Sequence, residues 1–121
     1  MKYALLIYQD DEQWESMSQE AHKEISREYF ALRDDLKASG QYLDGQRLAP
    51  TIAATSVRRR EGETLITDGP FADTKEQFAG FWIIDAPNLD EAIVAAARTP
   101  AARYGTIEVR PIMELPAGPL E

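Results

Sequence analysis

Residues 67–76, which read Thr-Asp-Gly-Pro-Phe-Ala-Asp-Thr-Lys-Glu, bring carboxylates and a lysine close together in the sequence. Asp68 or Glu76 could transfer a proton, and Lys75 could hold an anionic group beside them. Asp-Gly-Pro is typical of a rigid turn, because the aspartate bonds backbone amides, the glycine allows unusual φ and the proline fixes the next angle. A purely structural interpretation also fits, in which Asp68 only closes the turn and Phe71 fills the core.

His22 is the only histidine, and no other side chain ordinarily titrates near neutral pH. It falls near the start of a predicted helix, whose positive end favours a neutral ring that could act as general base or hydrogen-bond donor. The alternative is a surface histidine on the first helical turn. A lone histidine without cysteine argues against a zinc site. We expect no cofactor, since no glycine-rich phosphate loop is present.

The first half of the chain predicts a strand and a long helix. Residues 3–8 are wholly apolar and rich in strand formers, and a polar loop containing Trp14 follows. Ser18 is the predicted N-cap of the helix, and Gly40 ends it. One face of this helix carries an apolar stripe, whereas Phe30 points nearly opposite. The stripe consists of Ala21, Ile25, Tyr29, Leu32 and Leu36.

The second half predicts a strand, a hairpin with a three-residue loop, an apolar strand, a helix capped by Asn88 and a last strand. Leu89, Ala92, Ile93 and Ala96 are expected on one apolar face of that helix. Pro111 suits an edge strand. The predicted elements are residues 41–48, then 55–60 and 64–68 around the loop 61–63, then 78–84, 89–98 and 107–113.

This order predicts an α+β fold of the ferredoxin-like βαββαβ type with an inserted hairpin and two helices on one face of the sheet. We expect a single domain over residues 1–114 and a loose tail over 115–121. The first and third main strands are apolar on both faces, and monomers rarely expose such a face. Pairing sheet to sheet with a second copy would cover it in a homodimer, a dimeric α+β barrel. The alternative is that the tail or the hairpin folds over it.

The predicted topology gathers polar residues at one end of the sheet. Asp10 and Asp11 follow the first strand, His22 begins the helix, and Asp68 precedes the third main strand. We therefore expect a small-molecule site there, with Asp68 and His22 as candidate catalytic residues. The candidate ligand-binding residues are Tyr8, Phe71, Lys75, Glu76, Arg103 and Tyr104.

Composition excludes several partners. The chain has 21 acidic and 13 basic residues, a net charge of −8 that repels nucleic acid. Arg58 to Arg60 are expected to form a solvated strand edge. No stretch approaches the roughly 20 apolar residues of a membrane helix. The apolar start lacks a signal-peptide cleavage site and the chain lacks cysteine, which predicts a cytoplasmic protein.

Three segments together, residues 1–8, 67–77 and 100–111, resemble the DGPF family, a branch of the YCII-related proteins of bacteria. Asp73 stands where the family motif usually has glutamate. The resemblance implies a ferredoxin-like domain that dimerises into an α+β barrel. YCII-related proteins are suspected enzymes with a proposed histidine–aspartate pair. His22 lies in a comparable part of the first helix, although the DGPF branch does not typically depend on a histidine there.

Three functions stay open. The first is a small enzyme that acts on small polar or anionic organic molecules, with Arg103 and Lys75 holding the anion and Asp68 or Glu76 moving a proton. The second is a non-catalytic ligand-binding or regulatory module. Its suggested partner is an extracytoplasmic-function sigma factor, because DGPF members tend to be encoded beside one. The third is a purely structural dimer.

Overall fold

The computed structural model describes residues 1–119, and within them it has a four-stranded antiparallel sheet, a separate two-stranded hairpin and three helices. This confirms the α+β fold. The strands are β1 (Lys2–Gln9), β2 (Tyr42–Arg47), β3 (Thr55–Arg60), β4 (Glu63–Asp68), β5 (Gln77–Asp85) and β6 (Thr106–Pro111). The helices are α1 (Asp11–Ser16), α2 (Gln19–Ala38) and α3 (Leu89–Arg98), with short 3-10 turns η1 (Thr51–Ala53) and η2 (Pro100–Arg103).

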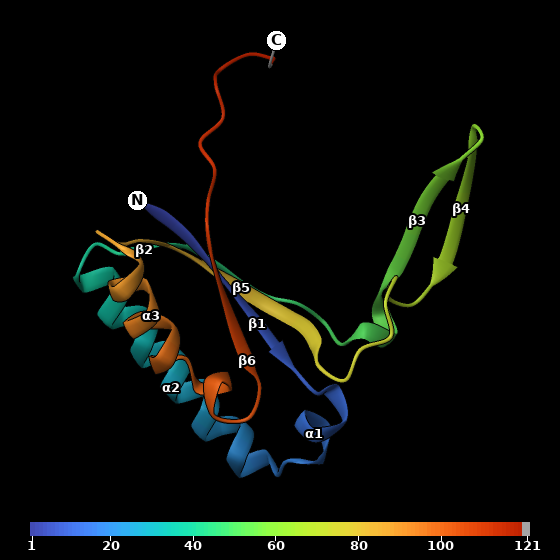
Figure 1. The fold of residues 1–121 in the computed structure, drawn as a ribbon. Helices are drawn as coiled ribbons and strands as arrows, with labels where there is room; N and C mark the ends of the chain where they lie inside the picture. The colour runs from blue at the N-terminus through green and yellow to red at the C-terminus, as the bar shows by residue number, and fades with distance from the viewer. Residues whose placement is uncertain (120–121) are drawn as a thin grey trace.

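The main sheet has the strand order β2-β5-β1-β6, and α2 and α3 cover one of its faces (Figure 1). Successive strand residues point to opposite faces, so every second residue of β1 meets the helices. Leu5 and Ile7 are buried there, together with Trp82 and Ile84 of β5. The intervening residues of β1 are only half-buried, because no helix of the described chain covers the other face.

The predicted caps of α2 are confirmed. The Ser18 hydroxyl accepts a hydrogen bond from the backbone N–H of Ala21 at 3.1 Å. Gly40 follows the helix at φ 76°, a left-handed conformation that costs glycine little. Of the predicted apolar stripe, Ile25, Leu32 and Leu36 are buried, and Tyr29 packs at the edge of the core. The stripe therefore fixes which face of α2 lies over the sheet.

Two predictions about the helices are wrong. The expected loop around Trp14 is the short helix α1, capped by the Asp10 carboxylate, which accepts from the backbone N–H groups of Glu12 and Gln13. This helix buries none of its residues, so it has no apolar periodicity to detect. On the predicted apolar face of α3, Ala92 and Ala96 are buried and allow close packing, but Leu89 and Ile93 are exposed.

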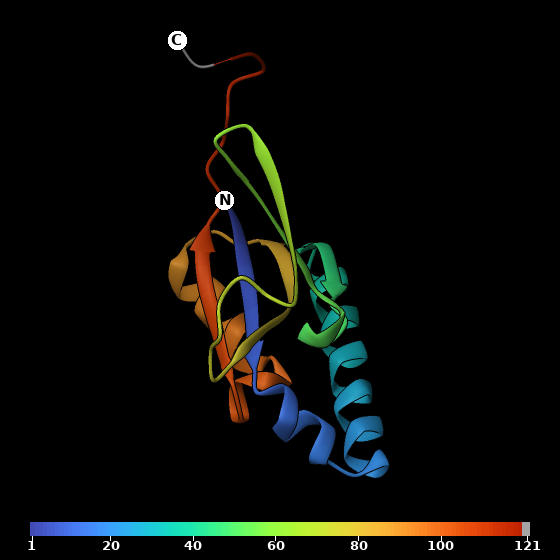
Figure 2. The ribbon, with the colours of Figure 1, turned by 90° about the vertical axis from the view of Figure 1, so that its right-hand side faces the viewer.

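The inserted hairpin is present, but its predicted three-residue loop is wrong. The turn has two residues, Glu61 and Gly62, at φ 52° and 79°. Positive φ at both positions matches the twist of a two-residue hairpin turn. Figures 1 and 2 show β3 and β4 projecting away from the main sheet, and every residue of β4 is exposed. The hairpin therefore does not cover the open face of the sheet.

The last strand lies at the edge of the sheet, as Pro111 suggested, but it ends at that residue. Residues 112–119 contain no helix or strand and run away from the sheet in Figure 1. They leave the open face uncovered. The end of the predicted tail, residues 120–121, lies outside the described residues.

Candidate functional site

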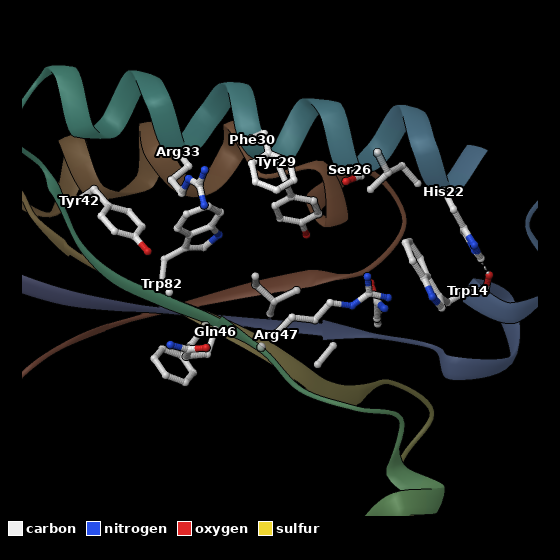
Figure 3. Close-up of a pocket in the computed structure, with 17 residues that line it drawn as sticks. Trp14, His22, Ser26, Tyr29, Phe30, Arg33, Tyr42, Gln46, Arg47 and Trp82 are labelled. Carbon is white, nitrogen blue, oxygen red and sulfur yellow. Dashed lines mark hydrogen bonds between the residues drawn. The ribbon is translucent and has the colours of Figure 1, made fainter. Parts of the chain in front are cut away.

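A cavity of about 300 Å³ lies between α2 and the β2–β5 side of the sheet (Figure 3). Its lining comes from α1, α2, β1, β2 and β5, and much of it is aromatic. Trp82 and Tyr42 rise from the sheet, Tyr29 faces them from α2, and Trp14 lies toward the other end.

The charged side chains of the lining are cations. Arg33 of α2 and Arg47 of β2 both line the cavity, beside the polar side chains of Gln9, Gln46 and His22. None of the described side chains in the lining is a carboxylate, although the chain has 21 acidic residues against 13 basic ones. A cleft lined by one sign of charge concentrates ligands of the opposite sign. The lining is therefore suited to an anion.

Arg47 extends along the cavity toward Trp14, with its guanidinium carbon 4.7 Å from the centre of the indole ring (Figure 3). Its side chain has no hydrogen-bond or ion-pair partner within residues 1–119. A guanidinium carries five N–H donors in a planar fork that matches a carboxylate. Arg47 is exposed, so its donors meet water, which a ligand could replace.

Two phenols lie near this arginine. Burial, reinforced by the neighbouring Tyr104, raises the pKa of Tyr29 well above its usual range, and the cations of Arg47 and Arg103 only partly oppose this. Burial also raises the pKa of Tyr104. Both phenols therefore stay protonated at neutral pH and can donate a hydrogen bond.

Trp82 has a buried donor in the wall of the cavity. The side chain is only 7% exposed, and its Nε1–H has no partner within residues 1–119. Its ring packs against those of Tyr29, at 6.1 Å between centroids, and Tyr42, at 5.8 Å. The Nε of Arg33 is likewise buried without a partner. A buried donor without an acceptor costs about 1–3 kcal/mol, and neither nitrogen is accessible to a water-sized atom, so both are costs of the packing around the cavity.

His22 is committed to its neighbour in α1. Its Nε2 lies 2.7 Å from the backbone carbonyl oxygen of Trp14, and that oxygen can only accept, so Nε2 carries the proton. Within residues 1–119, no aspartate side chain bonds His22, so the structure contains no histidine–aspartate pair there. The ring is half-buried and lines one end of the cavity.

The residues predicted from the central motif do not reach this cavity. Asp68 is the exposed last residue of β4, and Lys75 is exposed in the loop before β5. Phe71 is 81% exposed, so the interpretation in which it fills the core is wrong. Phe71 and Tyr8 line a second, open hollow of about 540 Å³ between the 48–54 segment and the motif loop.

The remaining predicted site residues hold chain segments together. The Glu76 carboxylate accepts a hydrogen bond from the Thr106 hydroxyl at 2.8 Å. Arg103 forms an ion pair with Glu28 of α2 at 2.7 Å. Tyr104 packs partly against the core. The residues predicted to form one site at the end of the sheet thus lie in three places: the cavity, the second hollow and these contacts between segments.

Sequence reasoning missed Arg47, Trp82 and the role of Tyr29. The cation of Arg47 gave no signal by itself, because a strand-end arginine is ordinarily solvated. Trp14 did give one, since a large aromatic in an acidic, polar segment requires a packing partner.

Within residues 1–119, no group of three or more histidine, aspartate or glutamate side chains is placed to hold a metal ion. No helix among them combines the length and apolar character needed to cross a membrane.

Comparison with known proteins identifies the family. The family model of the YCII-related domain matches residues 1–116. An uncharacterised protein of Rhizobium meliloti (strain 1021) is 40% identical over 114 residues, which cover 93% of this chain and 92% of that protein. Both matches include the elements that form the cavity. The chain belongs to the family of YCII-related domain proteins.

Proposed function

We propose that this YCII-related protein binds a small organic anion in the cavity between α2 and the sheet. The observation that carries the proposal is the charge of the lining, in which Arg33 and Arg47 stand without a carboxylate among the described side chains. An anion bound there would meet donors for which no acceptor of the lining competes.

The charge of the lining supports an anion over a neutral ligand. Arg47 can bind a carboxylate through two parallel N–H donors, and the protonated phenol of Tyr29 can add a third. No carboxylate of the described lining competes with the ligand for these donors.

The geometry favours binding over acid–base catalysis by the central motif. Asp68 and Glu76 do not line the cavity of their own chain, so either would have to come from a second copy to act as base. The regulatory alternative, with a sigma factor as partner, needs only the binding step and would use the same cavity.

We also propose that the fold is ferredoxin-like, with residues 1–114 as one domain, and that the chain belongs to the DGPF branch. The strand order β2-β5-β1-β6 and the helices α2 and α3 support the topology. Residues 67–77 support the branch. The lack of cysteine supports a reducing, cytoplasmic setting.

A homodimer completes the proposal. The open face of the sheet carries apolar cross-strand neighbours, Leu6 and Phe81, which are only half-buried. The hairpin adds Val57 and Ile66, which pair across its strands and are exposed. Isolated two-stranded hairpins are only marginally stable. Burial of these surfaces against a second copy would form the α+β barrel.

Thermal shift measurements test the anion site. Benzoate and cyclohexanecarboxylate should raise the melting temperature of the wild-type protein by mass action, and the neutral benzamide should raise it less. Arg47→Met should abolish the carboxylate effect, because it removes the fork. Arg58→Met, which makes the same change of charge on the exposed hairpin, is the control and should retain it. If neither acid stabilises the protein, or if both variants respond alike, the proposal is wrong.

A further inference from the structure

We infer that the anion bound in this cavity is a 2-hydroxy acid, whose hydroxyl and carboxylate together meet the side-chain amide of Gln9. This inference rests on the proposed anion binding in the same cavity and specifies the chemical class of the ligand. It comes from a buried polar side chain of the lining that no other part of residues 1–119 satisfies.

Gln9 is the last residue of β1 and continues the row of side chains that faces the helices. Every second residue of a strand points to the same face, and the earlier members of this row, Tyr3, Leu5 and Ile7, are apolar and buried. Gln9 is buried as well, with only 8% of its surface exposed, and it lines the cavity. A polar amide therefore occupies a position where the pattern of the strand predicts an apolar side chain.

The side-chain amide of Gln9 makes no hydrogen bond within residues 1–119. Its oxygen and nitrogen are not sealed by packing, in contrast with Nε1 of Trp82, so a ligand in the cavity can reach them. Gln77, the partner of Gln9 in β5, has no such capacity left. Its amide accepts from the backbone N–H of Asp11 and donates to the carbonyl oxygen of Thr74. Of the two paired glutamines, only Gln9 is available to a ligand.

The amide of Gln9 lies at the same end of the cavity as the guanidinium of Arg47. Ile7, Gly80 and Arg47 are paired in one row across β1, β5 and β2, and Gln9 is the next residue of β1 on that face. From this row the side chain of Arg47 extends toward Trp14, which α1 holds just beyond the end of β1 (Figure 3). One small ligand can therefore contact the amide and the guanidinium through neighbouring groups.

The amide requires a ligand that donates as well as accepts. Its carbonyl oxygen only accepts, its NH2 group only donates, and the two stand side by side. A carboxylate has no proton to donate, so by itself it satisfies the NH2 group and leaves the carbonyl of Gln9 without a partner. A hydroxyl on the carbon next to the carboxylate supplies the missing donor in the adjacent position. The second carboxylate oxygen then remains for Arg47.

The charge of the lining favours a hydroxyl over an ammonium group as this donor. Arg33 and Arg47 line the cavity, and none of the described side chains of the lining is a carboxylate. The ammonium group of a 2-amino acid would lie near like charges without a counter-ion, which is unfavourable. A hydroxyl donates the same hydrogen bond without a charge. The site is therefore suited to a hydroxy acid rather than an amino acid.

Isothermal titration with four acids on one carbon frame tests the class on the wild-type protein. 1-Hydroxycyclohexanecarboxylate should bind about tenfold more tightly than cyclohexanecarboxylate, because its hydroxyl satisfies the buried carbonyl of Gln9. 4-Hydroxycyclohexanecarboxylate should gain at most about twofold, because its hydroxyl lies away from the carboxylate. 1-Aminocyclohexanecarboxylate should bind about tenfold more weakly than its hydroxy counterpart.

Two variants locate the hydroxyl. Gln9→Met keeps the length of the side chain but removes the amide, so the preference for the 1-hydroxy acid over the unsubstituted acid should fall to about onefold. The melting temperature of this variant without ligand should not fall, because an apolar side chain replaces a buried amide that lacks a partner. Gln19→Met, which makes the same change at an exposed position outside the cavity, should keep the preference.

The outcomes separate this inference from the proposed function. If the 1-hydroxy acid gains nothing over the unsubstituted acid, or if the 4-hydroxy or the 1-amino acid binds as tightly, the inferred class is wrong while anion binding stands. If none of the four acids binds, both are wrong. If Gln9→Met retains the preference, or melts at a lower temperature than the wild type, the amide does not serve the ligand and the inference fails. The comparison on the wild-type protein does not depend on whether Gln9→Met folds.

Discussion

The indole ring of Trp14 stacks on the imidazole ring of His22, with centroids 4.1 Å apart and planes inclined by 14°. The same histidine donates from Nε2 to the backbone carbonyl of Trp14 at 2.7 Å. These two contacts join α1 to α2 at the end of the cavity. Hydrogen bonds of Asp11 with Gln77 and Thr51 hold the start of α1, so we infer that the Trp14–His22 pair holds the rest of this helix in place.

Replacing His22 should therefore loosen α1. His22→Ala removes the ring contact and the hydrogen bond, which together contribute about 1–2 kcal/mol. Amide hydrogen exchange in residues 11–16 should become about 5- to 30-fold faster, measured by NMR or mass spectrometry. His22→Phe keeps a ring and should give an intermediate increase. Exchange as slow as in the wild type for His22→Ala would contradict the assigned role.

Gly105 lies in one of the segments that resemble the DGPF family, and close packing rather than chemistry explains why a glycine stands there. A Cβ at this position would lie 2.2 Å from the backbone oxygen of Tyr8 and 3.2 Å from that of Ala101. Neither backbone atom can move without disturbing β1 or η2. Gly105→Ala should therefore lower the free energy of unfolding by about 3 kcal/mol, measured by urea denaturation.

Gly118→Ala is the matched control for that measurement. A Cβ there meets nothing within 4 Å, so the free energy of unfolding should change by less than about 0.5 kcal/mol. Equal stability of the two variants would show that the close approach of Gly105 to β1 is relieved at little cost.

Local patterns in the sequence were enough to predict most elements. The apolar runs of β1 and β5 and the caps Ser18 and Asn88 are each contained in a few consecutive residues. The hairpin turn was placed one residue too long, because Glu61 takes a positive φ that non-glycine residues seldom adopt.

The cavity could not be predicted in the same way. Its main residues, Trp14, Tyr29, Arg47 and Trp82, come from four different elements. Whether Arg47 faces the helix depends on the register of β2 in the sheet, and that register cannot be predicted from the sequence alone. Asp68 was predicted at the end of the sheet, but the hairpin that carries it projects away from the sheet (Figure 1). No local pattern in the sequence indicates that direction.

Alkaline pH should destabilise the protein partly through Tyr29. Burial raises its pKa in the folded state above the ordinary value near 10. Below pH 10 both states keep the proton, so the group has no effect. Above pH 10 the unfolded chain loses that proton while the folded chain keeps it, so the free energy of unfolding falls as pH rises. Urea denaturation at pH 8, 10 and 11 should show a shallower fall for Tyr29→Phe, and an identical fall would refute the assignment.

The exposed apolar face of the hairpin predicts how the proposed homodimer can be disrupted. Ile66 is 69% exposed and pairs with Val57 across the two strands. Ile66→Asp would place a charge in the buried interface, which is strongly unfavourable without a partner. Sedimentation velocity should show a dimer for the wild type and a monomer for Ile66→Asp. Thr67→Asp adds the same charge on the opposite face of β4 and should remain dimeric. A monomeric wild-type protein at tens of micromolar, or a dimeric Ile66→Asp variant, would rule out an interface through this face, and the exposed sheet would then need another cover.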